Sequence, residues 1–93
     1  MSEAVFTFSP WKAITSAVCE RARGMEVHRN GAHVATIREN WARKRRGAPL
    51  SVMSYDIDHR AWPEAPYRDW LPEFLGIEEA LEQAKKRVCS VYR

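Results

Sequence analysis

The sequence predicts an α+β fold, with an antiparallel sheet of three to four strands, a central hairpin and two helices on one face (β-α-β-β-β-α). The pair Asn30-Gly31 separates two runs of strand-forming residues and favours the positive φ angles of a type I′ turn. Apolar residues at helical spacing run through residues 77–91. The 93 residues suffice for one hydrophobic core and not for two, so residues 1–93 are expected to form a single domain.

The first elements follow from residues 4–24. Residues 4–8 are rich in strand formers, with Phe6 and Phe8 on one face. Ser9-Pro10 then predicts the start of a helix, because Ser caps helices and Pro suits the first helical position. That helix would end near Gly24. Its apolar side would comprise Trp11, Ile14, Val18 and Ala22, with Met25 next in the same spacing.

The hairpin joins residues 25–29 to residues 32–37. A two-residue loop sets the register, so we expect His28 opposite His33 and Val27 opposite Val34. Side chains alternate between the two faces of a strand. The core face would hold Met25, Val27 and Val34, and the other face Glu26, His28 and His33.

The second half of the chain contains three further segments. Residues 38–47 predict either a loop or one short helix capped by Asn40 and ended by Gly47. Residues 50–57 predict a strand with Met53, Tyr55 and Ile57 on one face. Dense prolines make residues 58–76 irregular. Residues 77–91 form a helix, with acidic residues at its start and basic residues near its end.

Charge is divided along the chain. Residues 21–55 contain eight basic and two acidic residues, a net charge of +6, whereas residues 56–82 contain two basic and eight acidic residues, a net charge of −6. The whole chain carries +3. Such a division concerns surface potential and partners rather than fold.

A basic run around Trp41 is the feature most typical of a binding surface. Phosphate binding needs several cations, and an exposed Trp stacks on a base or fills a groove on a protein. The alternative is a solubilising loop between strands, with Trp41 turned inward. The candidate partner-binding residues here are Arg38, Trp41, Arg43, Lys44, Arg45 and Arg46.

A second candidate surface is the aromatic segment 62–74. Aromatic residues and Arg dominate interface hot spots, but in a chain this small the same residues also fill the core beneath the sheet. Both interpretations stay open. The candidate partner-binding residues are Trp62, Tyr67, Arg68 and Trp70.

Catalytic and metal-binding patterns are weak. His28 and His33 would be cross-strand neighbours, yet no third ligand is fixed beside them. The run Asp56-Ile57-Asp58-His59 lacks a phosphate-binding loop or a second acidic cluster. Cys19 and Cys89 form neither a disulfide framework nor a metal motif and are expected to be buried thiols. No catalytic residue, metal or cofactor is therefore predicted.

The distribution of charged and apolar residues also predicts where in the cell the protein is found. The longest uncharged stretches fall far short of the roughly 20 apolar residues that a spanning helix needs, so no membrane contact is predicted. Glu3 and the lack of a basic leader argue against a secretory signal. We expect a cytoplasmic protein.

Two families resemble the chain in the order of their elements. From Pro10 onward the order helix, three strands, helix is similar to that of double-stranded-RNA-binding domains, but Ile77-Glu78-Glu79-Ala80 stands where their phosphate-binding cations lie. The hairpin 25–35, a further strand and a terminal helix starting at Gly76 resemble small proteins of phages and mobile elements, including some anti-CRISPR proteins. This second resemblance implies an inhibitor that blocks a surface on a bacterial nucleoprotein complex.

The leading hypothesis is therefore a non-enzymatic binding protein, a phage or mobile-element accessory that inhibits a host protein or nucleoprotein complex by occupying its surface. The alternative is a small basic regulator that binds nucleic acid through residues 38–46. A third hypothesis is a small metal-dependent nuclease that uses Asp56, Asp58 and a histidine.

Overall fold

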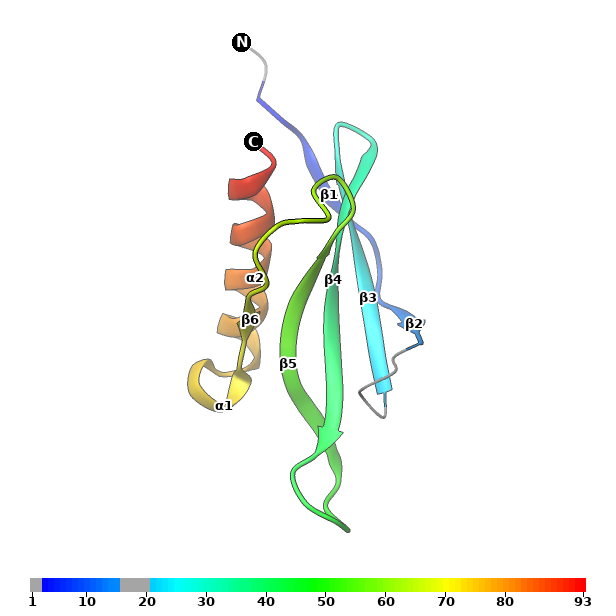
Figure 1. Cartoon of the computed structure of the whole chain (residues 1–93), viewed down its shortest axis with the longest axis vertical. Coiled ribbons are helices and arrows are strands. Elements are labelled where there is room, and N and C mark those ends of the chain that lie inside the picture. Colours follow the sequence, from blue (N-terminus) through cyan, green and yellow to red (C-terminus); the bar gives the residue numbers. More distant parts are fainter. Residues whose placement is uncertain (1–2, 16–20) are drawn as a thin grey trace.

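The structure is a computed structural model that describes residues 3–15 and 21–93. It is α+β, with a six-stranded sheet and two helices (Figure 1). The elements in chain order are β1 (Phe6–Phe8), β2 (Lys12–Ile14), β3 (Arg21–Arg29), β4 (Ala32–Arg43), β5 (Leu50–His59), β6 (Asp69–Trp70), α1 (Pro72–Leu75) and α2 (Ile77–Val91).

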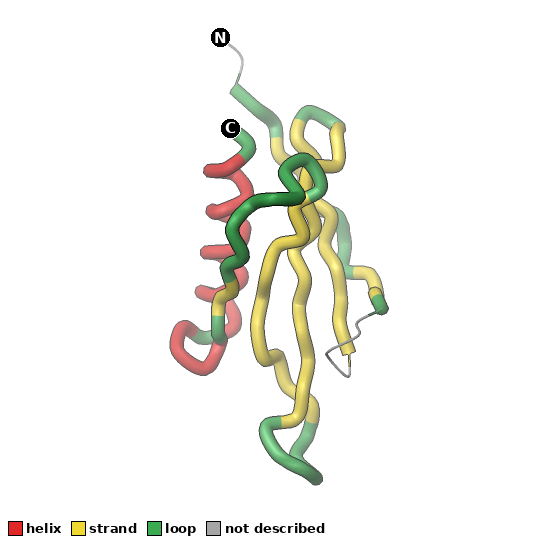
Figure 2. Tube along the Cα trace, in the orientation of Figure 1, coloured by secondary structure: helices red, strands yellow, loops and turns green. Residues whose placement is uncertain are grey.

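All strand pairs are antiparallel, in the order β1-β3-β4-β5-β6. β1 and β2 both pair with β3, β1 near its end and β2 near its start. α2 lies along one face of the sheet, and the hairpin of β4 and β5 extends beyond it at one end (Figure 2). The molecule is elongated, with extents of 53 × 25 × 25 Å.

The core lies between α2 and the central strands. Val27, Ile37 and Tyr55 supply its largest fully buried side chains from the sheet, and Val88 supplies one from α2. Ala80 and Ala84 are also fully buried, and their small side chains let the helix approach the sheet closely. Trp70 of β6 closes the cluster beside them. This packing stabilises α2, whose isolated sequence is near the lower length limit for a helix in water.

The predicted hairpin is confirmed, with one correction. Asn30 and Gly31 have φ angles of 50° and 85°, and His28 lies opposite His33. Beyond that pair the expected register is wrong, because Val27 lies opposite Ala35 instead of Val34. The register shift, a β-bulge, turns Ile37 onto the core face and Thr36 away from it. Burial of Ile37 explains why the bulge is favoured over the simple register.

The helix predicted from Pro10 to Gly24 is wrong in the described residues. Residues 12–14 form β2 and residues 21–24 begin β3, while Val18 and Cys19 lie outside the described residues. Ser9 does not cap a helix, since its hydroxyl accepts a hydrogen bond from the Glu26 amide at 2.8 Å. Pairing with β3 satisfies the backbone of this segment and overrides the helical spacing of its apolar residues.

The sheet is larger than the predicted three to four strands, because several segments read as loops are paired. Residues 38–43, predicted as a loop or short helix, continue β4. The irregular segment 58–76 contains β6 and α1. Only one long helix, α2, packs on the sheet in the described chain, and its predicted bounds are confirmed. In residues 3–15 and 21–93, neither helix has the length and hydrophobicity that crossing a bilayer requires.

Candidate functional site

Four consecutive cations lie where β4 turns into β5. We call this group, Arg43, Lys44, Arg45 and Arg46, the basic tip; all four side chains are exposed. The turn has internal supports. The Arg43 guanidinium donates to the Ala48 carbonyl at 2.6 Å, and the Ala48 amide donates to the Arg45 carbonyl at 3.1 Å. Gly47 has a φ of +82°, a value that a residue with a side chain rarely adopts.

The basic tip projects from the body of the protein (Figure 1). β3 accompanies β4 only as far as the pair Arg21–Trp41. Beyond it, Ala42 pairs with Ser51 and Arg43 with Leu50, so this end consists of two of the described strands. At about 3.3 Å per residue, these pairs and the turn extend roughly 10 Å beyond the three-stranded part. The basic tip is thus the end of a two-stranded ribbon.

The cations of the basic tip differ from Arg38, which lies earlier in β4, in whether they form an ion pair. Within residues 3–15 and 21–93, no hydrogen bond or ion pair holds the side chains of Lys44, Arg45 or Arg46. Arg38, predicted as part of the same surface, instead bonds the buried Asp56 at 2.5 Å, and this bond raises the pKa of its guanidinium. Three cations without an ion pair in the described residues therefore lie next to one another at the tip.

Trp41 lies in β4 at the base of the ribbon and is partly buried. Its indole N–H donates to Glu39 at 2.8 Å, and the Arg21 guanidinium lies 5.6 Å from its ring centroid. These contacts anchor the ring to the sheet. Trp41 thus serves the ribbon as a support, in agreement with the inward orientation that the sequence left open.

Glu39 is the centre of a buried polar network beneath the ribbon. Only 3% of its surface is exposed, yet its carboxylate is fully engaged. It accepts hydrogen bonds from Arg23 at 2.7 Å and from the Tyr55 hydroxyl at 2.7 Å, besides that from Trp41. Burial and the negative charge of Glu39 raise the pKa of Tyr55, which stays protonated. The network fixes three strands to one another just above the tip.

An apolar groove of about 610 Å³ opens between the ribbon and α1. Val52 and Met53 of β5 line one side, and Pro72 and Ile77 line the other. Met53 is 49% exposed because a second bulge in β5 leaves it without a partner on β4. Arg43, Lys44 and Glu73 supply the charged groups of this groove.

The aromatic segment divides between core and surface. Trp70 is 4% exposed and belongs to the core, whereas Trp62 and Tyr67 are 42% and 70% exposed. The Arg68 guanidinium lies 5.6 Å from the centroid of the Trp70 ring, on the outer side of the fold. Of the four candidates in this segment, Trp70 therefore belongs to the core, whereas Trp62 and Tyr67 are exposed.

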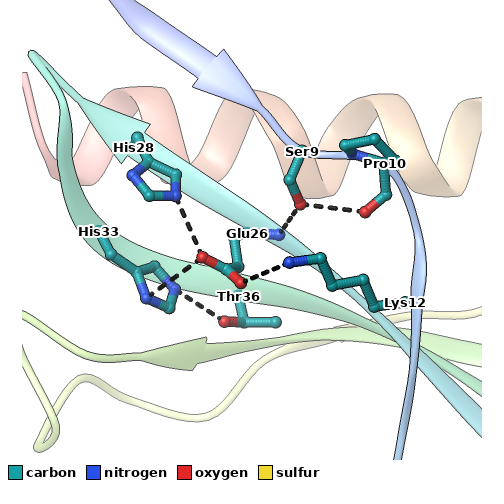
Figure 3. Close-up of polar contacts among 7 residues, drawn as sticks. All are labelled: Ser9, Pro10, Lys12, Glu26, His28, His33 and Thr36. Atoms are coloured by element: carbon teal, nitrogen blue, oxygen red, sulfur yellow. Dashed lines mark hydrogen bonds and ion pairs between the residues drawn. The ribbon is translucent and has the colours of Figure 1, made fainter.

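The two hairpin histidines belong to a polar cluster on the sheet face opposite α2 (Figure 3). Their rings stack with centroids 5.2 Å apart. Glu26 accepts a hydrogen bond from His28 at 3.1 Å and pairs with Lys12 at 3.5 Å, and the His28 bond lowers the pKa of its carboxyl. Among the described residues no three His, Cys, Asp or Glu side chains are arranged to hold a metal ion.

The residues of the acidic run 56–59 lie on both faces of the sheet. Asp56 is 5% exposed and accepts hydrogen bonds from Arg38 and Asn40 on the open face. His59 lies on the helix face, 2.6 Å from the Tyr92 hydroxyl. Burial and the charge of Arg87 lower the pKa of His59. Asp56 and His59 thus cannot act on one substrate atom together.

Cys89 is a free thiol on α2. Burial raises its pKa above the ordinary value, and the negative charge of Glu82 raises it further. The thiol therefore stays protonated at neutral pH. It is partly buried, where the sequence predicted a buried thiol. Cys19 lies outside the described residues.

Comparisons with protein-family models, with curated proteins and with solved structures found no match to this chain.

Sequence reasoning missed the contribution of α2 to the charged surface. Lys86 and Arg87 approach Arg68 across a hollow beside Trp70. Residues 83, 86, 87 and 90 are three or four positions apart, so they lie on the same side of a helix. This spacing could have identified them from the sequence.

Proposed function

We propose that this chain is a non-enzymatic binding protein whose basic tip contacts duplex DNA, alone or within a nucleoprotein complex. The observation that carries the proposal is a projecting turn with three cations that no described residue neutralises. Nucleic-acid affinity comes largely from such cations, because each phosphate they neutralise releases condensed counterions.

The ribbon favours DNA over double-stranded RNA. The major groove of B-form DNA is about 12 Å wide and 8.5 Å deep and admits a two-stranded β-ribbon. The ribbon extends roughly 10 Å beyond the three-stranded sheet, which is close to that depth. The major groove of A-form RNA is deep and too narrow for side chains to read.

This geometry supports a protein that competes with a host complex for the DNA that the complex binds. A chain of 93 residues that binds DNA without altering it competes with whatever else uses the same stretch. This is consistent with the inhibitor implied by the resemblance to phage and mobile-element proteins. Asp56 and His59 lie on opposite faces of the sheet, so a nuclease that used Asp56 and Asp58 would need another histidine.

Fluorescence anisotropy with a labelled duplex of about 24 base pairs tests the proposal. The variant Lys44→Glu, Arg45→Glu, Arg46→Glu is compared with Arg60→Glu, Lys85→Glu, Arg93→Glu, which has the same net charge but leaves the tip intact. We expect the slope of log affinity against log salt to fall in magnitude by about 2 to 3 for the tip variant. Equal losses in the two variants, or no binding by the parent chain at about 50 mM salt, would overturn the proposal.

The groove beside the tip favours a second candidate function, direct docking on a protein. Met53 and Ile77 are about half exposed there, and Arg43 and Lys44 lie at its margin. The complementary occupant is a peptide segment with apolar anchors and acidic neighbours. Met53→Asp would abolish capture of such a protein and leave duplex affinity within about two-fold, whereas a large loss of duplex affinity would place the groove within the DNA contact.

A further inference from the structure

A cationic hollow of about 290 Å³ lies between α2 and the segment that enters β6. Arg68 comes from that segment, while Gln83, Lys86, Arg87 and Ser90 come from one flank of α2. Trp70 forms the remaining wall and is held in the core. Three cations and two neutral polar side chains thus line one shallow, open hollow, and none of its lining residues is acidic.

The cations of this hollow have no carboxylate partner among the described residues. In the described part of the chain, no ion pair holds Arg68, Lys86 or Arg87. By contrast, Arg23 and Arg38 are paired with buried carboxylates. Three like charges gathered in a concavity repel one another, and an anion placed among them relieves that repulsion.

We propose that the hollow binds a phosphate group, held by Arg68, Lys86 and Arg87 with Ser90 as a neutral hydrogen-bond donor. Guanidinium groups match phosphate oxygens in geometry, and the ammonium group of Lys86 adds a point charge. The source of the phosphate is either a phosphodiester of bound DNA or a free polyphosphate. The first source rests on the proposed function, and the second does not.

The position of the hollow is compatible with the first source. Trp70 pairs with Tyr55, which lies five positions along β5 from Leu50 at the base of the tip. That distance is roughly 17 Å along the strand, less than one turn of duplex, which is about 34 Å. A duplex whose major groove receives the ribbon presents phosphates on both edges of that groove, and the first source requires one of them to reach the hollow.

Nuclear magnetic resonance of the full chain with sodium tripolyphosphate tests the site without DNA. We expect saturable shifts of the Trp70 indole N–H and of the amides of residues 86–90. In Lys86→Glu the affinity should fall about ten-fold or more, because the change reverses one of three charges. The matched control is Lys85→Glu, one residue earlier on the same helix, where the ammonium lies against the Phe8 ring instead.

Two outcomes would overturn the site: no saturable shift around Trp70, or equal losses in Lys86→Glu and Lys85→Glu. The tip variant Lys44→Glu, Arg45→Glu, Arg46→Glu separates this result from the proposed function, because it should retain tripolyphosphate binding. Release of tripolyphosphate by the duplex of about 24 base pairs assigns the hollow to DNA. If tripolyphosphate stays bound while the duplex is also bound, the hollow is assigned to a free polyphosphate. Both results support a phosphate site.

Discussion

Single buried polar residues carry much of the specificity of this fold. Glu39 collects hydrogen bonds from β3, β4 and β5, and Asp56 collects them from β4 on the other face. A buried carboxylate is costly unless its oxygens are fully engaged. Each acid therefore requires its donors, and together they fix the pairing of the central strands.

Replacement of Tyr55 by Phe tests the network around Glu39. The hydroxyl is the partner of Glu39 Oε2 at 2.7 Å, so its removal leaves a buried carboxylate oxygen without that donor. We expect the free energy of unfolding to fall by about 1–3 kcal/mol. Guanidinium unfolding measures it, with Glu64→Gln as a control at an exposed site that should change by less than about 0.5 kcal/mol. Equal effects of the two substitutions would contradict the network.

Replacement of His59 by Gln tests its neutral state in the fold. Because burial lowers its pKa below 6.5, the unfolded chain binds a proton at a higher pH than the folded chain does. Stability therefore falls as the pH drops through the ordinary value of about 6.5. Unfolding at about pH 7.5 and about pH 5.5 should show a smaller fall in His59→Gln than in the parent. A parent and variant that lose stability equally would contradict the assignment.

At the scale of elements, local signals were reliable where one feature decides the conformation. Asn30-Gly31 predicted the turn because few other pairs tolerate two positive φ angles. The periodicity of residues 77–91 predicted α2 because its buried residues face a sheet. The segment after Pro10 was misread, since its strand exists through pairing with β3, which lies beyond it in the sequence.

The site was partly predictable for the same reason. Four adjacent cations cannot all be buried, so exposure of the basic tip followed from residue types alone. The division of Arg38 from the tip could not be predicted, because it depends on which strand position faces Asp56. Trp70 and Tyr67 illustrate the same limit. They are three residues apart, but pairing with Tyr55 and packing against α2 bury Trp70, while Tyr67 stays exposed.

Replacement of Asn30 by Ala tests how the turn organises the edge of the sheet. Asn30 supplies a positive φ and its side-chain oxygen accepts a hydrogen bond from the Val5 amide at 2.9 Å. We expect a loss of about 1 kcal/mol or more and faster hydrogen exchange at the Val5 amide. Asn30→Gly keeps the φ preference and loses only the bond. If Gly and Ala variants protect the Val5 amide as well as Asn does, the side-chain bond has no role.

On the scale of the whole molecule, the part of the fold that holds the core is separate from the part proposed to bind a partner. α2 and the core hold one end and the middle of the sheet, while β4 and β5 continue beyond them to the basic tip (Figure 1). Arg23 and Arg38 pair with buried carboxylates in the body. Within the described residues, by contrast, no ion pair holds Lys44, Arg45 and Arg46 at the tip, or Arg68, Lys86 and Arg87 beside α2. The protein therefore has a packed body and, at one end, an exposed cationic turn.

The most direct test of this account is to map where duplex DNA touches the protein. Amide spectra of the labelled chain, titrated at low salt with a duplex of about 24 base pairs, report every residue at once. The account predicts the largest saturable shifts at residues 43–48, with Arg60 and the turn at Asn30 unaffected. Shifts centred on that opposite end, or none that saturate, would contradict it.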